Sequence, residues 1–185
     1  MGLLSTLSFN GNKIITTGGG GAVLTNDDYL AARISHVSKT AKKLHRFKYF
    51  HDELGFNYRM PALNAALGTS QLLRMSHFLT AKERLTERYR SMGEKYEGFN
   101  FFEPPVGSHS NNWLNAIQLK KSSLADRDYL LERLNNIGYQ CRPAWDLLSS
   151  LPHLKHCPQM PLDNAKKILG SIINVPSGSA LADGF

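Results

Sequence analysis

The segment Ser8-Phe9-Asn10-Gly11-Asn12-Lys13 places a lysine among small and amide residues, between two runs of strand-forming residues. Such surroundings would hold the Lys13 side chain rigidly and remove part of its water. Desolvation disfavours the ammonium form of a lysine, and the neutral amine is the nucleophile that attacks an aldehyde to give an imine. The hydroxyl of Ser8, five residues earlier, could reach a phosphate on the same ligand. On residue types alone, the alternative is an ordinary solvated lysine beside a turn.

Four consecutive glycines, Gly18 to Gly21, invite comparison with a phosphate-binding loop. That loop requires GxxxxGK[ST] between a strand and a helix, whereas Gly21 is followed by Ala22-Val23-Leu24. The preferred interpretation is a tight β-hairpin in which glycines supply positive φ angles. Residues 14–17 and 22–25, which are rich in β-branched side chains, would be its strands.

Two histidines and a cysteine, His153, His156 and Cys157, lie within five positions and resemble half of a metal site. A zinc site needs further ligands, and the chain offers no second cluster with suitable spacing. We therefore expect a surface loop there and no bound metal. The second cysteine, Cys141, is distant from Cys157 in the sequence, so both are expected to be plain thiols without a disulfide.

The remaining pattern alternates helices and strands and predicts a mixed α/β fold. An N-terminal cap at residues 26–28 predicts a helix that runs to about Lys42. The residues before Pro61 form a polar and aromatic loop, and Pro61 suits the first position of a helix. The further predicted elements are a long helix over 62–96 broken once, a strand at 113–119, a helix at 125–137, an extended segment at 139–145, a helix at 163–169 and a strand at 172–176.

Composition indicates a folded protein, because 42% of the residues are hydrophobic and 20% are charged. No apolar run approaches the roughly 20 residues that a membrane span needs, and the N-terminus lacks the features of a signal peptide. These observations favour a cytoplasmic protein without a membrane partner.

The formal net charge of +7 is concentrated in a basic stretch over residues 39–48. Such a stretch would attract nucleic acid or a phosphorylated substrate. No recognition-helix, zinc-finger or RNA-binding pattern accompanies the charge, so a solvated helix end is the preferred interpretation and nucleic acid is not an expected partner.

Four blocks of the sequence together resemble the DegT/DnrJ/EryC1/StrS aminotransferases. They are SFNGNKIITTGGGGA (residues 8–22), GFNYRMPALNAA (residues 55–66), CRPAW (residues 141–145) and INVPS (residues 173–177). Within that family the chain is most similar to nucleotide-sugar 4-aminotransferases of the bacillosamine and legionaminic acid type. The resemblance covers nearly the whole chain.

The resemblance implies a role for particular residues. Lys13 matches the lysine that forms a Schiff base with pyridoxal 5'-phosphate, and Ser8 matches a hydroxyl that binds the cofactor phosphate. Asn57 matches an asparagine that reaches the cofactor phosphate of the neighbouring subunit in a homodimer. Tyr58 and Arg59, in the same loop, and Trp145 are candidate substrate-binding residues. For Arg59 the alternative is a solvated residue at a helix start, and for Trp145 it is core packing.

The resemblance also implies an incomplete transferase of fold type I. Family members carry a long N-terminal part before the lysine segment and a final helix after the INVPS strand. We therefore expect residues 1–85 to be a remnant of the large cofactor-binding domain and residues 86–185 to be the small C-terminal α/β domain. The parent reaction transfers an amino group from an amino acid, with glutamate expected, to a UDP-linked or other nucleotide-linked keto-sugar. The alternative is an inactive remnant of this family that acts, if at all, through protein association.

Overall fold

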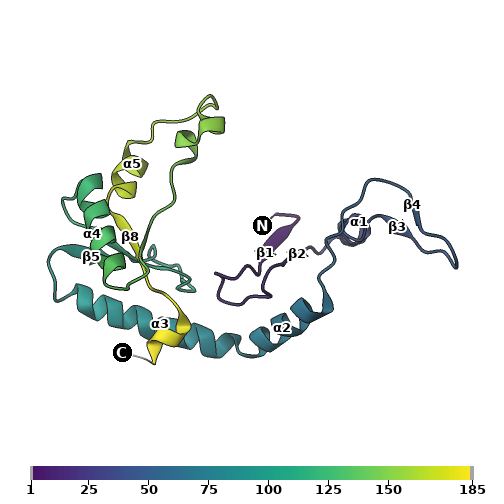
Figure 1. Cartoon of the computed structure of the whole chain (residues 1–185), viewed down its shortest axis with the longest axis horizontal. Helices are drawn as coiled ribbons and strands as arrows, with labels where there is room; N and C mark the ends of the chain where they lie inside the picture. The colour runs from purple at the N-terminus through teal and green to yellow at the C-terminus, as the bar shows by residue number, and fades with distance from the viewer. Residues whose placement is uncertain (1, 184–185) are drawn as a thin grey trace. The chain divides into compact units, whose positions relative to one another are not determined.

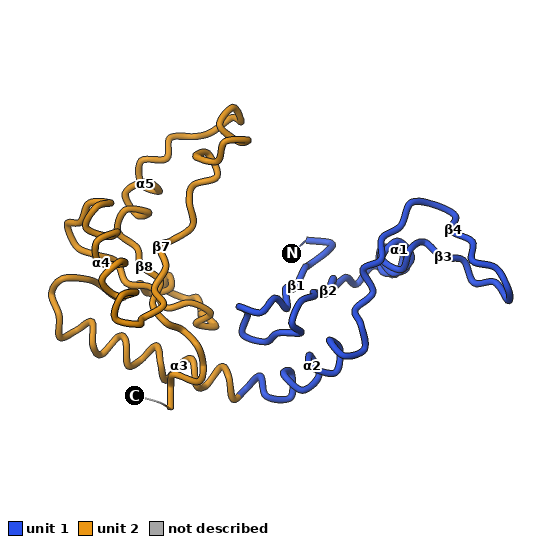
Figure 2. Tube along the Cα trace, in the orientation of Figure 1, with its two compact units in different colours: residues 1–76 blue, residues 77–185 orange. Residues whose placement is uncertain are grey.

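The computed structural model describes residues 2–183 and divides into two compact units, residues 1–76 and 77–185 (Figure 2). The elements of the first unit are β1 (Ser5–Ser8), β2 (Gly21–Leu24), α1 (Asp28–Val37), β3 (Lys42–Lys43), β4 (Phe50–His51) and α2 (Ala62–Leu73). Helix α3 (Met75–Gly93) begins there and continues into the second unit. The other elements of the second unit are β5 (Phe99–Phe101), β6 (Asn115–Leu119), α4 (Leu124–Asn136), β7 (Arg142–Pro143), three short 3-10 turns (Leu148–Ser150, Pro152–Leu154 and Ser179–Ala182), α5 (Asp163–Leu169) and β8 (Ile172–Val175).

The N-terminal hairpin joins β1 to β2 in antiparallel register, with Ser8 opposite Gly21 (Figure 1). The prediction of a strand at residues 14–17 is therefore wrong, and these residues belong to a long loop between the two strands. The hydroxyls of Thr16 and Thr17 donate to loop carbonyls instead of facing a sheet neighbour, which favours the loop over a strand. The glycines do supply positive φ angles, but at the end of this loop and not in a tight turn.

Helix α1 begins where the sequence predicts, because the Asp27 carboxylate accepts a hydrogen bond from the backbone N–H of Leu30. It ends at Val37 and not near Lys42. Thr40 and Ala41 have left-handed φ angles of 65° and 48°, which stop the helix. The basic residues beyond them form the exposed β3–β4 hairpin, so the expected solvated helix end is wrong.

The long helix predicted over residues 62–96 is present and has one break, at Arg74 between α2 and α3. Pro61 precedes the first helical residue in an extended conformation, with φ −63° and ψ 151°, one position earlier than expected. Its missing N–H leaves no unpaired donor there.

The second unit contains a four-stranded antiparallel sheet in the order β5-β6-β8-β7. Its core joins Leu131 of α4, Cys141 and the fully buried Ile173 of β8. Burial raises the pKa of the Cys141 thiol, as expected for a plain core cysteine. The sequence predicts α4, α5, β6 and β8 correctly in type and position, and it does not predict β5.

In the described part of the chain, no helix combines the length and the apolar character that crossing a membrane requires. The two compact units divide within α3, close to its start. The boundary between a large-domain remnant and a small domain, expected near residue 85, stays a prediction.

Helix α4 begins with a capping box, which generates a stability prediction. Ser123 Oγ accepts from the Asp126 N–H, and the Asp126 carboxylate accepts from the Ser123 N–H at 2.8 Å. Replacing Ser123 with alanine should lower the free energy of unfolding by about 1 kcal/mol. Urea unfolding monitored by circular dichroism measures this change. Ser123→Thr keeps the acceptor and should stay near the parent value; equal losses in both variants would contradict the capping role.

Candidate active site

Lys13 lies in the loop between β1 and β2, at a tight turn. The Lys13 backbone N–H donates to the Asn10 carbonyl at 3.0 Å, and the side chain is half-buried. The loop is closed at its base by two bonds to Phe9, whose N–H donates to Gly20 O and whose carbonyl accepts from the Thr17 N–H. These bonds fix the position of the lysine backbone without a regular strand.

Ser8 ends β1 immediately before this loop, and its residue is exposed. Its Oγ accepts a weak 3.4 Å hydrogen bond from the Asn10 N–H, so the hydroxyl is held near the start of the turn that carries Lys13. Ser8, at the end of β1, and Lys13, in the loop that follows, therefore lie on one ordered segment. The cause is hydrogen bonding within the loop and not the predicted pair of flanking strands.

Helix α2 contacts the lysine loop at Thr17. Asn64 Nδ2 donates to the Thr17 carbonyl at 2.6 Å, and Thr17 itself is 3% exposed. Gly68 lies one helical turn later, where an added Cβ would stand 2.8 Å from Thr17 Cγ2. Only glycine at position 68 permits this approach without a shift. Sequence reasoning missed both supports, although an amide and a glycine four residues apart in the apolar first half of the helix could have indicated one contact face.

The segment with Asn57, Tyr58 and Arg59 lies before α2, and all three residues are exposed. The backbones of Asn57 and Lys39 form an isolated antiparallel β-bridge, and the Tyr58 N–H donates to the Ser38 carbonyl. The Tyr58 ring stacks on the Phe56 ring, with the ring centroids 5.2 Å apart. These contacts fix the backbone of the segment and leave its side chains open to a ligand.

Met60 connects this segment to the lysine loop. A Cβ added to Gly20 would lie 2.9 Å from Met60 Cε, so the methionine methyl group lies close against the glycine run. The two segments that the sequence singles out in the first unit are therefore neighbours at this point.

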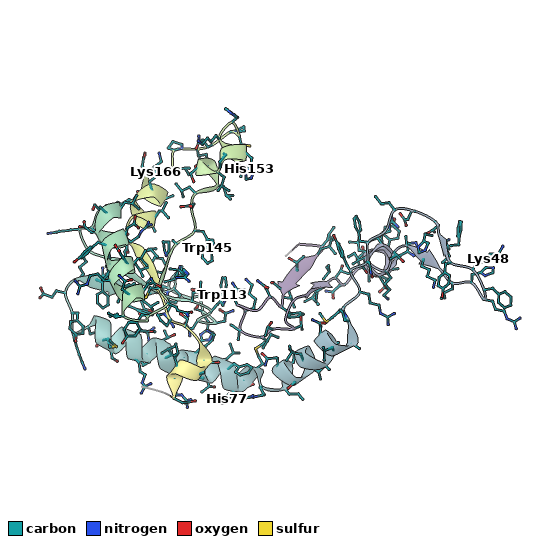
Figure 3. The ribbon with its side chains drawn as sticks, viewed as in Figure 1. Lys48, His77, Trp113, Trp145, His153 and Lys166 are labelled. Atoms are coloured by element: carbon teal, nitrogen blue, oxygen red, sulfur yellow. The ribbon has the colours of Figure 1, made fainter. Side chains whose placement is uncertain are left out.

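Trp145 belongs to the second unit, where its indole stacks on Trp113 with ring centroids 5.9 Å apart (Figure 3). The residue is 69% exposed and is therefore not a core residue. Sequence reasoning did not single out Trp113, and no motif marks it.

Among the described residues, one group could present three ligand atoms to a metal: His36, Asp52 and Glu53. The carboxylates are already paired with Arg33 and Lys43, so the group is an ion-pair network. The hydrogen bond from His36 lowers the pKa of Asp52, and that from Arg33 lowers the pKa of Glu53. His153, His156 and Cys157 are exposed in the segment of short 3-10 turns and do not form such a group.

The segment from Ser8 to Lys13 has two groups that an aldehyde cofactor with a phosphate could use. Lys13 offers an amine for the aldehyde and Ser8 a hydroxyl for the phosphate, and the loop that carries Lys13 is held by its own hydrogen bonds and by α2. The described residues of this part of the chain therefore fit pyridoxal phosphate.

The sequence of the chain matches the model of a known protein family. The model of the DegT/DnrJ/EryC1/StrS aminotransferase family matches residues 1–184. The chain is 31% identical over 185 residues to GDP-perosamine synthase of Caulobacter vibrioides and 34% identical over 190 residues to that of Vibrio cholerae. These alignments cover 99% and 98% of this chain and 49% of each relative.

Among solved structures, the chain is similar to Helicobacter pylori PseC, an aminotransferase involved in the biosynthesis of pseudoaminic acid. The TM-score is 0.88 at 25% identity, covering 97% of this chain and 49% of PseC. The chain thus spans about half the length of the proteins that it matches.

The contact between α2 and the lysine loop can be tested by removing the Asn64 amide. Asn64→Ala should leave the Thr17 carbonyl without its donor and reduce the local stability of the loop by about 1 kcal/mol. Amide hydrogen exchange at Lys13 and Thr17 measures this as faster exchange. Thr69→Ala removes an exposed α2 hydroxyl that bonds only within its own helix, at Ala65 O, and should leave the loop unchanged. Unchanged exchange in Asn64→Ala would refute the anchoring role.

Proposed function

The chain belongs to the DegT/DnrJ/EryC1/StrS aminotransferase family, and we propose from this that it is the C-terminal part of a pyridoxal-phosphate-dependent sugar aminotransferase. The family predicted from the sequence blocks is confirmed, and so is the fold expected for sugar aminotransferases of this kind. The C-terminal placement is part of the proposal. So is the activity, because the relatives are about twice as long.

The observation that carries the proposal is the position of Lys13. Its backbone is fixed by the turn from Asn10, its side chain is half-buried, and the loop is anchored to α2 through Thr17 and Asn64. A lysine that must capture an aldehyde repeatedly needs a fixed position with limited access to water. A solvated surface lysine has neither property.

The chain's own residues would divide the work as follows. Lys13 Nζ would hold the cofactor and, once displaced by the amino donor, would carry a proton to and from the reacting carbon. Ser8 Oγ would donate to the cofactor phosphate. When bound, pyridoxal phosphate supplies an aldehyde for amine capture and an electron-withdrawing ring. The ring-nitrogen partner that this chemistry requires would come from a part of the enzyme outside this chain.

Asn57, Tyr58 and Arg59 would act at a shared site of a homodimer. The backbones of Asn57 and Tyr58 are fixed by pairing with residues 38–39, and all three side chains are exposed, as a segment that serves a neighbouring subunit requires. Asn57 would reach the partner's cofactor phosphate, and Tyr58 and Arg59 would face the substrate.

The proposed substrates are a nucleotide-linked keto-sugar and an amino acid, with glutamate as the donor. GDP-perosamine synthase and PseC support the sugar class by their names. The narrower placement among bacillosamine and legionaminic acid type 4-aminotransferases belongs to the proposal too. The β3–β4 hairpin carries exposed cations, including Lys42 over the Tyr49 ring at 3.8 Å, and would attract the diphosphate.

Exposed apolar side chains in the first unit support a larger assembly. On the β1–β2 hairpin, Leu7 and Leu24 are about half exposed, at 46% and 52%, and Leu63 and Leu73 of α2 are 82% and 84% exposed. A two-stranded hairpin with open edges is marginal in water by itself. These surfaces would be covered by the rest of the enzyme and by a second subunit.

Borohydride reduction with pyridoxal phosphate tests the proposal. Reduction should attach the cofactor to Lys13, and peptide mapping by mass spectrometry should find most of the label there because that amine is the one held in a site. Lys13→Ala should remove this label with circular dichroism unchanged. Lys48→Ala deletes an exposed lysine of the β3–β4 hairpin and should leave the label at Lys13 in place.

The alternative is an inactive remnant that retains the sequence by descent. Label spread evenly over the exposed lysines of the native chain, with none enriched at Lys13, would favour that alternative and reject the proposed site. Repeating the experiment at several protein concentrations shows whether labelling of Lys13 requires association.

A further inference from the structure

Trp113 and Trp145 form a stacked pair in the second unit. Trp113 precedes β6 and Trp145 follows β7, the two strands that flank β8 in the sheet. Their ring centroids are 5.9 Å apart and their planes make an angle of 26° (Figure 3). Residues far apart in the sequence thus build one aromatic surface from two loops at the sheet.

The backbone under Trp113 is fixed by a buried lysine. Lys82 Nζ donates to the carbonyls of Asn112 (3.1 Å), Trp113 (3.1 Å) and Ser177 (2.5 Å), and Lys82 is only 5% exposed. Burial lowers the pKa of Lys82. Burying a cation is costly, so its use to hold three carbonyls indicates that the position of this loop matters.

The backbone conformation at Asn112 also indicates that the position of this loop matters. Asn112 has a left-handed φ of 52°, and the Trp113 N–H donates to Asn111 Oδ1 at 3.1 Å. Residues held in unfavourable backbone regions gather at ligand-binding sites, where the surrounding structure maintains them. These contacts fix the backbone from which the Trp113 indole extends.

Trp145 is supported by this arrangement but remains 69% exposed, whereas tryptophan is on average largely buried. Trp113 is half-buried and lies behind it. An exposed indole that is already positioned by a second ring loses little conformational freedom when a flat ligand stacks on it.

We propose that the exposed indole of Trp145, supported by Trp113, is a stacking platform for the nucleobase of the nucleotide-sugar substrate. This inference rests on the proposed function and names the part of the substrate that the second unit binds. Stacking tolerates different bases because every base has a π face. Lys82 is a positioning residue here, since it acts through the Trp113 backbone.

Tryptophan fluorescence can report on this site alone, because the chain contains two tryptophans and both belong to the pair. Titration of the full chain with UDP and with GDP should give saturable quenching for both nucleotides. Inorganic pyrophosphate, which has no base, should not quench. The inference would be overturned if neither UDP nor GDP quenched the fluorescence. It would also be overturned if pyrophosphate quenched as strongly as the nucleotides.

Substitutions of Trp145 test whether its ring binds the nucleotide by stacking on the base. Trp145→Leu should weaken UDP binding about tenfold by calorimetry, whereas Trp145→Phe should keep most of the affinity. Tyr129→Leu removes a comparably exposed aromatic ring on α4, outside the pair, and should bind as the parent does. Equal affinity in Trp145→Leu and the parent would reject the platform.

Lys82→Met tests the positioning role. With folding intact by circular dichroism, it should reduce the quenching amplitude and weaken UDP binding, because the Trp113 backbone would lose its anchor. Unchanged quenching and affinity would reject that role.

The outcome is independent of the test on Lys13. Lys13 labelling without nucleotide quenching would reject the platform and leave the aminotransferase proposal standing. Nucleotide quenching without Lys13 labelling would reject the aminotransferase proposal and leave a nucleotide-binding surface.

Discussion

The candidate active site depends on one contact, the approach of the Thr17 backbone to α2. The lysine loop contains no strand of its own, and hydrogen bonds of Phe9 with Gly20 and Thr17 close its base. The loop is also anchored to α2, because Asn64 donates to the Thr17 carbonyl and because Gly68 leaves room for the threonine methyl group. Without the contact to α2, the turn that carries Lys13 would depend on the hydrogen bonds of its own loop alone.

In the second unit, too, a helix side chain holds loops through hydrogen bonds to their carbonyls. The sheet and α4 supply an ordinary apolar core around Ile173, but the loops at the sheet depend on a buried charge. Lys82 joins the loop before β6 to the segment after β8 by hydrogen bonds to their carbonyls. In both units, side chains from a helix satisfy loop carbonyls and so tie the loops that carry the candidate residues to a regular element.

Exposure also has a consistent pattern. In the first unit, apolar side chains of β1, β2 and α2 remain open to solvent, and the polar segment around Asn57 is ordered but exposed. The chain spans about half the length of these relatives, and the exposed surfaces are the ones that the proposed function assigns to further contacts. The ion-pair network around His36 and Asp52, by contrast, is satisfied within the unit itself.

The sequence by itself determined the family, the mixed α/β class and most helices, because motifs, caps and helical periodicity are local signals. It also indicated Lys13 and Ser8 as partners on one segment. Tertiary structure alone decided that residues 14–17 form a loop, since Thr16 and Thr17 have strand-forming side chains whose hydroxyls bond instead within the loop. It also decided the early end of α1, the support of Thr17 by Asn64 and the pairing of Trp113 with Trp145. The support of Thr17 and the tryptophan pair depend on contacts between residues distant in the sequence, and no local pattern encodes which distant carbonyl or ring a side chain will meet.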